Sequence, residues 1–181
     1  MQTFGRSHDL PVVSLRFQNV YRPGQSLSNP YTGISSIFSN LILTGKNINV
    51  FEDGKESRDF VFIDDVVNAI FLSLKKEFDH TDNNIFNVGS GVQTSVYDVA
   101  ATLKEIYNKE IDIEISGNFR KGDIRHCYAD LNKIQDYLGF VPKTDFRSGL
   151  KTFADWVLNQ EIVKNKYETS LMEMKEKGLL K

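Results

Sequence analysis

The chain has 181 residues, and its 22 lysines and arginines against 24 aspartates and glutamates give a formal net charge of -2. This balance excludes a general electrostatic attraction to nucleic acid or anionic membrane, so an anionic ligand would be held by a few local cations. The length allows one domain or a part of a larger fold. The single cysteine, Cys127, excludes an intrachain disulfide.

The histidines follow no metal-ligand spacing, so we expect no metal site; they are His8, His80 and His126. No apolar stretch approaches the roughly 20 residues that cross a bilayer. Residues 1–10 do not resemble a signal peptide, because charged side chains interrupt any apolar region. We therefore expect a cytoplasmic protein with neither a nucleic-acid nor a membrane partner.

The first predicted elements are the end of a helix at Thr3–His8 and a strand at Val12–Phe17. This strand is apolar and β-branched, which is typical of a parallel sheet. A turn-rich stretch follows over residues 22–33. Apolar residues then recur at helical spacing before Gly45, namely Ile34, Ile37, Phe38, Leu41 and Ile42.

Short strands are predicted next, at Ile48–Phe51, Phe60–Ile63 and Asn84–Val88. Asp64 is expected to cap a helix over Asp65–Lys75. Ser95 is expected to cap the amphipathic helix that carries Val96, Val99, Ala100, Leu103 and Ile106.

Strands and helices also alternate in the last third of the sequence. Ile111–Ile115 has the alternation of a half-exposed strand, and Asp130 is expected to cap a helix that ends at Leu138-Gly139. A late helix follows with Leu150, Phe153, Ala154, Val157 and Leu158 on one face, and residues 160–181 predict a charged, exposed helix. Alternating strands and helices make the fold α/β.

Two motifs of dinucleotide-dependent enzymes are absent from this sequence. No glycine-rich turn joins a first strand to a helix, where such a turn would bring amides against a pyrophosphate. Gly89-Ser90-Gly91 follows a strand and precedes a capped helix, so it could bind an anion, but a plain turn is the commoner interpretation. No tyrosine is followed four residues later by a lysine.

Two clusters of charged residues are candidates for ligand binding. Residues 56–59, Glu-Ser-Arg-Asp, precede a predicted strand, and residues 120–125, Arg-Lys-Gly-Asp-Ile-Arg, follow another. Arginine can hold two phosphate oxygens at once, and an aspartate beyond it could accept both hydroxyls of a ribose. Phe51, at a strand end, could stack on a base. Each feature alone is also compatible with a solvated surface or an ordinary core.

The order of these segments resembles extended short-chain dehydrogenases, the NAD-dependent nucleotide-sugar epimerases and dehydratases. The likeness covers about residues 1–160 and rests on six segments in the family's order. They are Leu15–Gln25, Val50–Gly54, Arg58–Val66, Phe86–Gly89, Arg120-x-Gly122-Asp123, and Asp130-x-x-Lys133 followed by Leu138-Gly139-Phe140-x-Pro142.

The resemblance implies a role for each matched residue. Asn19 would reach the diphosphate or sugar, Phe51 would pack on the base with Asn49 beside it, and Phe17 would approach the nicotinamide. Arg58 and Arg120 would hold the diphosphate, and Asp123 the nucleotide ribose. Thr32, Gly33 and Ile34 fall in a loop that touches substrate in the family. Arg22 stands where the family has glycine, which brings the geometry of that loop into question.

For fold, the resemblance implies the late part of a Rossmann-like parallel sheet plus a small α/β substrate-binding domain. Residues 1–25 and 59–100 would be the remainder of the dinucleotide-binding domain. Residues 26–58 and 101–160 would bind substrate, and residues 161–181 would form a C-terminal helical tail. The chain would thus be the C-terminal portion of the enzyme, completed by an N-terminal half with the glycine-rich turn and the Tyr-x-x-x-Lys pair.

For activity, the resemblance implies C4 oxidation and re-reduction of a UDP- or dTDP-hexose through catalytically used NAD. A 4,6-dehydratase and a non-catalytic sugar-nucleotide-binding module remain as alternatives. No catalytic residue is assigned in this chain, which alone is expected to be inactive and to bind NAD weakly. The expected partners are a nucleotide-diphosphate sugar, the N-terminal half, and further copies in a homo-oligomer, since the strands at 12–17 and 84–88 would have apolar edges.

Overall fold

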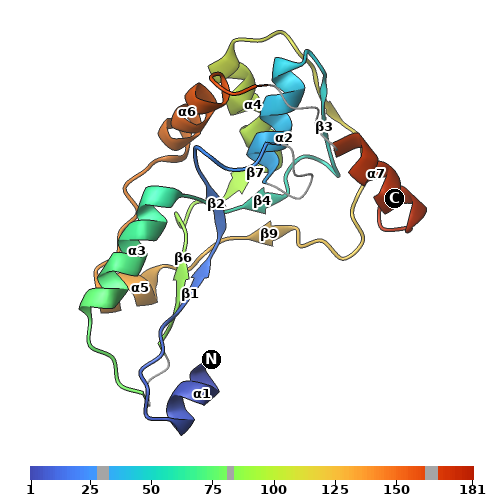
Figure 1. Cartoon of the computed structure of the whole chain (residues 1–181). Helices are drawn as coiled ribbons and strands as arrows, with labels where there is room; N and C mark the ends of the chain where they lie inside the picture. The colour runs from blue at the N-terminus through green and yellow to red at the C-terminus, as the bar shows by residue number, and fades with distance from the viewer. Residues whose placement is uncertain (28–32, 81–83, 162–166) are drawn as a thin grey trace. The chain divides into compact units, whose positions relative to one another are not determined.

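The computed structural model describes residues 1–27, 33–80, 84–161 and 167–181, which belong to two compact units (Figure 1). Unit 1 is made of Met1–Val20, Asp59–Val92 and Tyr128–Phe146. Unit 2 is made of Tyr21–Arg58, Gln93–Cys127 and Arg147–Lys181. The chain therefore passes repeatedly between the units, and each is described by itself.

Unit 1 contains the predicted parallel strands. β1 (Ser14–Phe17) pairs in parallel with β6 (Ile85–Val88), with Ser14 opposite Ile85. β2 (Asn19–Tyr21), which the sequence did not predict, pairs with β5 (Phe60–Phe62). A short helix, α1 (Gln2–Ser7), precedes β1.

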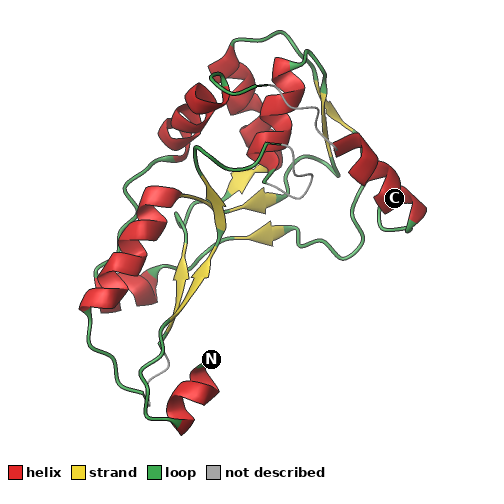
Figure 2. Ribbon diagram, viewed as in Figure 1, coloured by secondary structure: helices red, strands yellow, loops and turns green. Residues whose placement is uncertain are grey.

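Two helices form the core of unit 1 with these strands (Figure 2). They are α3 (Ile63–Lys75) and α5 (Asn132–Leu138). The buried cluster consists of Val61, Val66, Ala69, Phe86, Val88, Ile134, Leu138 and Phe140. At about 25 cal/mol per Å² of buried apolar surface, such a cluster is the main source of stability in a unit of this size.

Unit 2 is built on two packed helices, α2 (Ile34–Leu43) and α4 (Val96–Tyr107). Both contact β3 (Ile48–Val50), which pairs in parallel with β8 (Ile113–Ile115). A separate sheet places β4 (Ser57–Arg58) between β7 (Thr94–Ser95), antiparallel, and β9 (His126–Cys127), parallel. α6 (Phe146–Val157) and α7 (Tyr167–Glu176) complete the described elements.

Several local signals are confirmed. The Ser95 hydroxyl accepts from the Asp98 amide, and the Asp98 carboxylate accepts from the Ser95 amide, which makes a capping box at the start of α4. Gly139 ends α5 with a φ of 67°, a left-handed conformation that glycine adopts without strain. Asp130 accepts from the amide of Asn132, the first residue of that helix, but the N-cap position is occupied by Leu131 and not by Asp130 as expected.

Two expectations about the helices are wrong. Asp64 does not cap α3, because the helix already begins at Ile63 and Asp64 lies in its first turn. The tail is not simply an exposed helix either. Tyr167 and Ser170 of α7 are buried, and so is Leu180 beyond its end. The sequence did not indicate these buried residues, because they are few and widely spaced in a segment of charged composition.

The compact units differ in extent from the predicted domain ranges. Residues 128–146 lie in unit 1 and residues 93–100 in unit 2. The assignment of cofactor and substrate binding to particular ranges stays a prediction. Within the described residues, no helix has the length and apolar character needed to span a bilayer.

Candidate substrate site

Most of the residues predicted to bind substrate lie in one compact unit. Unit 2 contains Asn49, Phe51, Arg58, Arg120 and Asp123, and unit 1 contains Phe17 and Asn19. Two pairs form within unit 2: Arg58 with Asp123, and Arg120 with Phe51.

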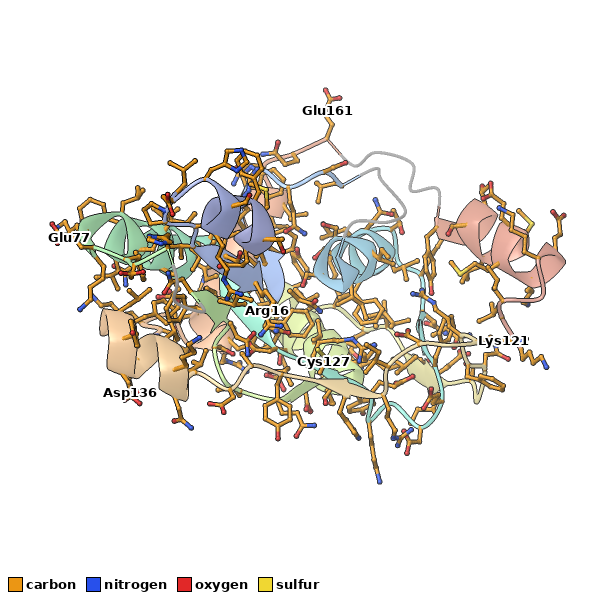
Figure 3. All side chains as sticks on the ribbon, turned by 90° about the horizontal axis from the view of Figure 1, so that it is seen from below. Arg16, Glu77, Lys121, Cys127, Asp136 and Glu161 are labelled. Atoms are coloured by element: carbon orange, nitrogen blue, oxygen red, sulfur yellow. The ribbon has the colours of Figure 1, made fainter. Side chains whose placement is uncertain are left out.

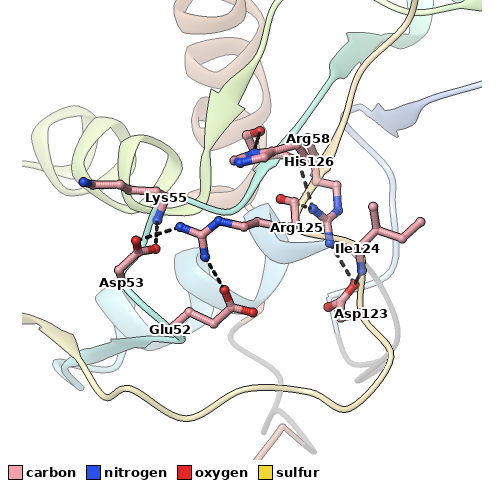
Figure 4. A network of polar contacts seen from close by, with 9 residues as sticks. Glu52, Asp53, Lys55, Arg58, Asp123, Ile124, Arg125 and His126 are labelled. Atoms are coloured by element: carbon pink, nitrogen blue, oxygen red, sulfur yellow. Dashed lines mark hydrogen bonds and ion pairs between the residues drawn. The ribbon is translucent and has the colours of Figure 1, made fainter.

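Arg58 is held by the middle strand of the three-stranded sheet. Its Nη2 donates to Asp123 Oδ1 at 2.8 Å, and its Nη1 donates to the Ser57 and Arg125 carbonyl oxygens at 2.9 and 3.2 Å (Figure 4). The Arg58 side chain is 21% exposed and that of Asp123 is 43% exposed. The charges are thus oriented by the fold while remaining accessible, as a site for an anionic ligand requires.

Arg120 lies against an aromatic ring. Its guanidinium carbon is 5.4 Å from the centroid of the Phe51 ring, within the range of a cation–π contact. Phe51 directly follows β3 and is half-buried, so its ring is neither wholly core nor wholly surface. Asn49 lies in β3 and is exposed, opposite Glu114 in the register.

Arg125 is a structural member of this region that the sequence did not single out. Its two terminal nitrogens donate to Glu52 and to Asp53, the latter at 2.7 Å (Figure 4). The hydrogen bond from Arg125 holds the pKa of Asp53 below its usual range, and the same bond raises that of Arg125. Arg125 thereby connects the turn after Phe51 to Arg58, because its own carbonyl oxygen accepts from the Arg58 side chain. Its partners lie more than 70 residues away, so only the position of Arg125 in a charged cluster could have drawn attention to it.

Glu56 belongs to the predicted cluster at residues 56–59, but unlike Arg58 it has a side-chain atom, Oε2, that is buried and without a hydrogen-bond partner within the described ranges. Burial raises the pKa of this carboxyl group.

The turn Gly89-Ser90-Gly91 of unit 1, which we call the glycine turn, binds a carboxylate of the protein itself. Asp59 is fully buried, and its Oδ1 accepts from the Ser90 amide and hydroxyl, while its Oδ2 accepts from the Gly91 and Ala129 amides. A Cβ on Gly89 would lie 2.3 Å from Asp59 Oδ2, so the turn needs glycine for this close approach. These amides are therefore taken, and this turn does not fit the pyrophosphate of NAD.

The two predicted residues of unit 1 are both accessible. Phe17 ends β1 opposite Val88 and is exposed. Asn19 begins β2, its amide donates to the Asp59 carbonyl oxygen at 2.9 Å, and its side chain is exposed.

The Arg22 loop is not distorted by its bulky side chain. The left-handed conformation in this turn falls on Gly24, with a φ of 80°, and Arg22 Nη1 donates to the Pro23 carbonyl oxygen at 2.9 Å. Of the predicted substrate loop, Gly33 and Ile34 begin α2, and Thr32 lies outside the described residues. In the described ranges, no group of three or more histidine, cysteine or acidic side chains could hold a metal ion.

Residues 1–89 match the NAD dependent epimerase/dehydratase family. The dTDP-L-rhamnose 4-epimerase of Burkholderia thailandensis is 40% identical over 155 residues, covering 86% of this chain and 42% of that protein. Over these residues the chain is similar to the NAD-dependent epimerase/dehydratase family. Arg120 and Asp123 lie beyond the residues that the family match covers.

Solved structures show the same fold. The UDP-glucose 4-epimerase of Thermotoga maritima, solved with UDP-glucose, is 35% identical with a TM-score of 0.77, covering 87% of this chain and 49% of that one. MoeE5, solved with UDP-glucuronic acid and NAD, is 32% identical with a TM-score of 0.70, covering 82% and 48%. The α/β fold with parallel strands is thus that of nucleotide-sugar epimerases. The chain spans about half the length of these relatives.

Proposed function

We propose that this chain is the substrate-binding, C-terminal portion of an NAD-dependent nucleotide-sugar epimerase that acts on a UDP- or dTDP-hexose. The observation that carries the proposal is the pairing of Arg58 with Asp123, together with the cation–π contact of Arg120 with Phe51, within unit 2. These residues come from segments about 65 residues apart. Oriented, partly exposed charges of this kind suit a ligand that has a diphosphate, a ribose and a base.

Each residue has a distinct task in this proposal. Arg58 and Arg120 bind the diphosphate by charge-assisted hydrogen bonds, and Asp123 accepts the ribose hydroxyls. Phe51 packs on the base, with Asn49 beside it. Asn19 contacts the diphosphate or sugar and Phe17 the nicotinamide. NAD, when bound in the complete enzyme, supplies reversible hydride transfer at C4; this chain's own residues bind and orient the sugar nucleotide.

The test is the affinity of the 181-residue chain for UDP and dTDP, measured by calorimetry for the native sequence and for Arg58→Ala. A charge-assisted hydrogen bond contributes roughly 1.5–3 kcal/mol, so the dissociation constant should rise about ten- to a hundredfold. Arg147→Ala is the matched control, because it removes the same charge from an exposed pair with Glu105 in the same unit. An unchanged dissociation constant for Arg58→Ala would contradict the proposal.

A non-catalytic sugar-nucleotide-binding module is the second candidate. Asp59 uses the Ser90 and Gly91 amides, so this turn offers no cofactor site, and the module needs none. Proton NMR of the complete protein with NAD and a UDP- or dTDP-hexose distinguishes the candidates. Formation of the C4 epimer supports the epimerase, loss of water from the sugar indicates a dehydratase, and unchanged sugar indicates the module.

A further inference from the structure

The end of the chain is paired with the segment that contains Arg120. We call residues 179–181 the strap and residues 116–125 the arginine loop. The Phe119 amide donates to the Lys181 carbonyl oxygen at 2.8 Å, and the Lys181 amide donates back at 3.0 Å. The Lys121 amide donates to the Leu179 carbonyl oxygen at 2.9 Å, and Arg120 is opposite Leu180 in an antiparallel bridge. The backbone is therefore fixed on both sides of Arg120.

The strap is itself anchored to unit 2. Leu180 is 6% exposed, whereas its neighbour Leu179 is 45% exposed. The amides of both leucines donate to the Met174 carbonyl oxygen in α7, at 3.3 and 2.9 Å, and Gly178 makes the reversal with a φ of 65°. Figure 3 labels Lys121 near the end of α7. Apolar burial of Leu180 thus holds a backbone pairing in place.

The other side of the arginine loop is held by the turn that carries Phe51. The Glu52 amide donates to the Asn118 carbonyl oxygen at 2.7 Å, and Arg125 binds Glu52 and Asp53. Arg120 therefore lies in a segment fixed at both ends, with its guanidinium over the Phe51 ring. Positioning of this kind lowers the entropy lost when a flexible cation binds a ligand.

We propose that the strap is a positioning element for the diphosphate site, with Leu180 as the anchor that keeps Arg120 over Phe51. This inference rests on the proposed function, because it assigns Arg120 to the diphosphate. The strap acts on the ligand through the position of Arg120, whereas Arg58 is held outside the strap, by the Ser57 and Arg125 carbonyl oxygens. Its loss should weaken nucleotide binding without abolishing it.

The experiment compares Leu180→Asp with Leu179→Asp, which places the same charge on the exposed neighbour. Hydrogen exchange of the Phe119 and Lys121 amides reports on the strap, and calorimetry reports on UDP, both with the 181-residue chain. In Leu180→Asp we expect protection of both amides to fall about tenfold or more, since burying a charge opposes docking. The dissociation constant for UDP should rise about tenfold, as for one lost charge-assisted bond. Leu179→Asp should change neither.

The outcomes separate this inference from the proposed function. Unchanged protection in Leu180→Asp overturns the strap, whatever UDP does. Lost protection with unchanged UDP affinity also overturns it, provided that Arg58→Ala weakens UDP binding. If neither Leu180→Asp nor Arg58→Ala changes the affinity for UDP, the proposed function fails instead. The hydrogen-exchange data then still decide whether the strap holds the arginine loop. Should Leu180→Asp fail to fold, a chain that ends at Gly178 is the second variant, with the same expected outcomes.

Discussion

In unit 1 the carboxylates of Asp59 and Asp65 are buried and none of their hydrogen bonds comes from an arginine among the described residues. In unit 2 those of Asp53 and Asp123 are exposed, and each accepts from an arginine as well as from a nearby backbone amide. Asp65 accepts from the Lys143 and Thr144 amides, which fixes the segment after α5. The buried carboxylates thus join loops of one unit. The exposed pairs keep arginine charges oriented and accessible.

Two adjacent residues show this difference between the units. Arg58 ends β4 in unit 2, and Asp59 directly follows it in unit 1. One belongs to the candidate substrate site and the other is enclosed by four donors. A family motif such as Arg-Asp-Phe therefore combines a binding residue with a structural one, and the two should respond differently to substitution.

The largest expected effect is that of Asp59→Asn on stability. The new amide group would face the Gly91 and Ala129 amides, so these two donors, of which that of Ala129 is buried, would lose their acceptor. We expect the free energy of unfolding to fall by about 3–5 kcal/mol, measured by urea denaturation at neutral pH. A loss below about 1 kcal/mol would mean that this buried carboxylate is not a structural element, and the contrast between the units would not hold.

A smaller effect is expected from a buried group of unit 2 at alkaline pH. Burial raises the pKa of Tyr107 to about 12, from an ordinary value near 10. Because the folded state binds this proton more tightly, the stabilisation is fully present below pH 10 and is lost as the pH rises towards 12. Two units correspond to about 2–3 kcal/mol, which is the most that this group can contribute.

The measurement is the free energy of unfolding between pH 9 and 11.5 for the native chain and for Tyr107→Phe. The variant should lose less stability over this range, because phenylalanine has no hydroxyl group to ionise. Tyr97→Phe changes an exposed ring on the same helix and serves as control. Equal alkaline slopes for Tyr107→Phe and the native chain would show that this tyrosine is not protected from ionisation.

The smallest effect is expected for Asp123→Asn, the same chemical change as in Asp59→Asn made in the exposed pair. Solvent screens the interaction with Arg58, so unfolding free energy should change by less than about 1 kcal/mol. Urea denaturation under identical conditions checks this. A cost approaching that of Asp59→Asn would mean that the Arg58–Asp123 pair is a structural element of unit 2 and not an accessible site.

The sequence alone determined the features that depend on neighbours in the chain. Apolar spacing gave α2, α4 and α6 within a few residues, and the Ser95 capping box and the Gly139 helix end follow from hydrogen bonds over three or four residues. The apolar, β-branched strand at Val12–Phe17 indicated a parallel sheet, but its pairing with β6 was not predicted. The family resemblance pointed to Arg58, Arg120, Asp123 and Phe51, but gave no indication of which of them touch.

The tertiary structure alone decided the pairings between distant segments. Arg58 and Asp123 are 65 positions apart, Asp59 and Ala129 are 70 apart, and the strap meets the arginine loop from the end of the chain. Such contacts depend on how strands and helices pack, and a charge run in the sequence is the same whether it is solvated or enclosed. That is why the glycine turn allowed an anion-binding interpretation from its sequence, and why only the fold identified Asp59 as the anion.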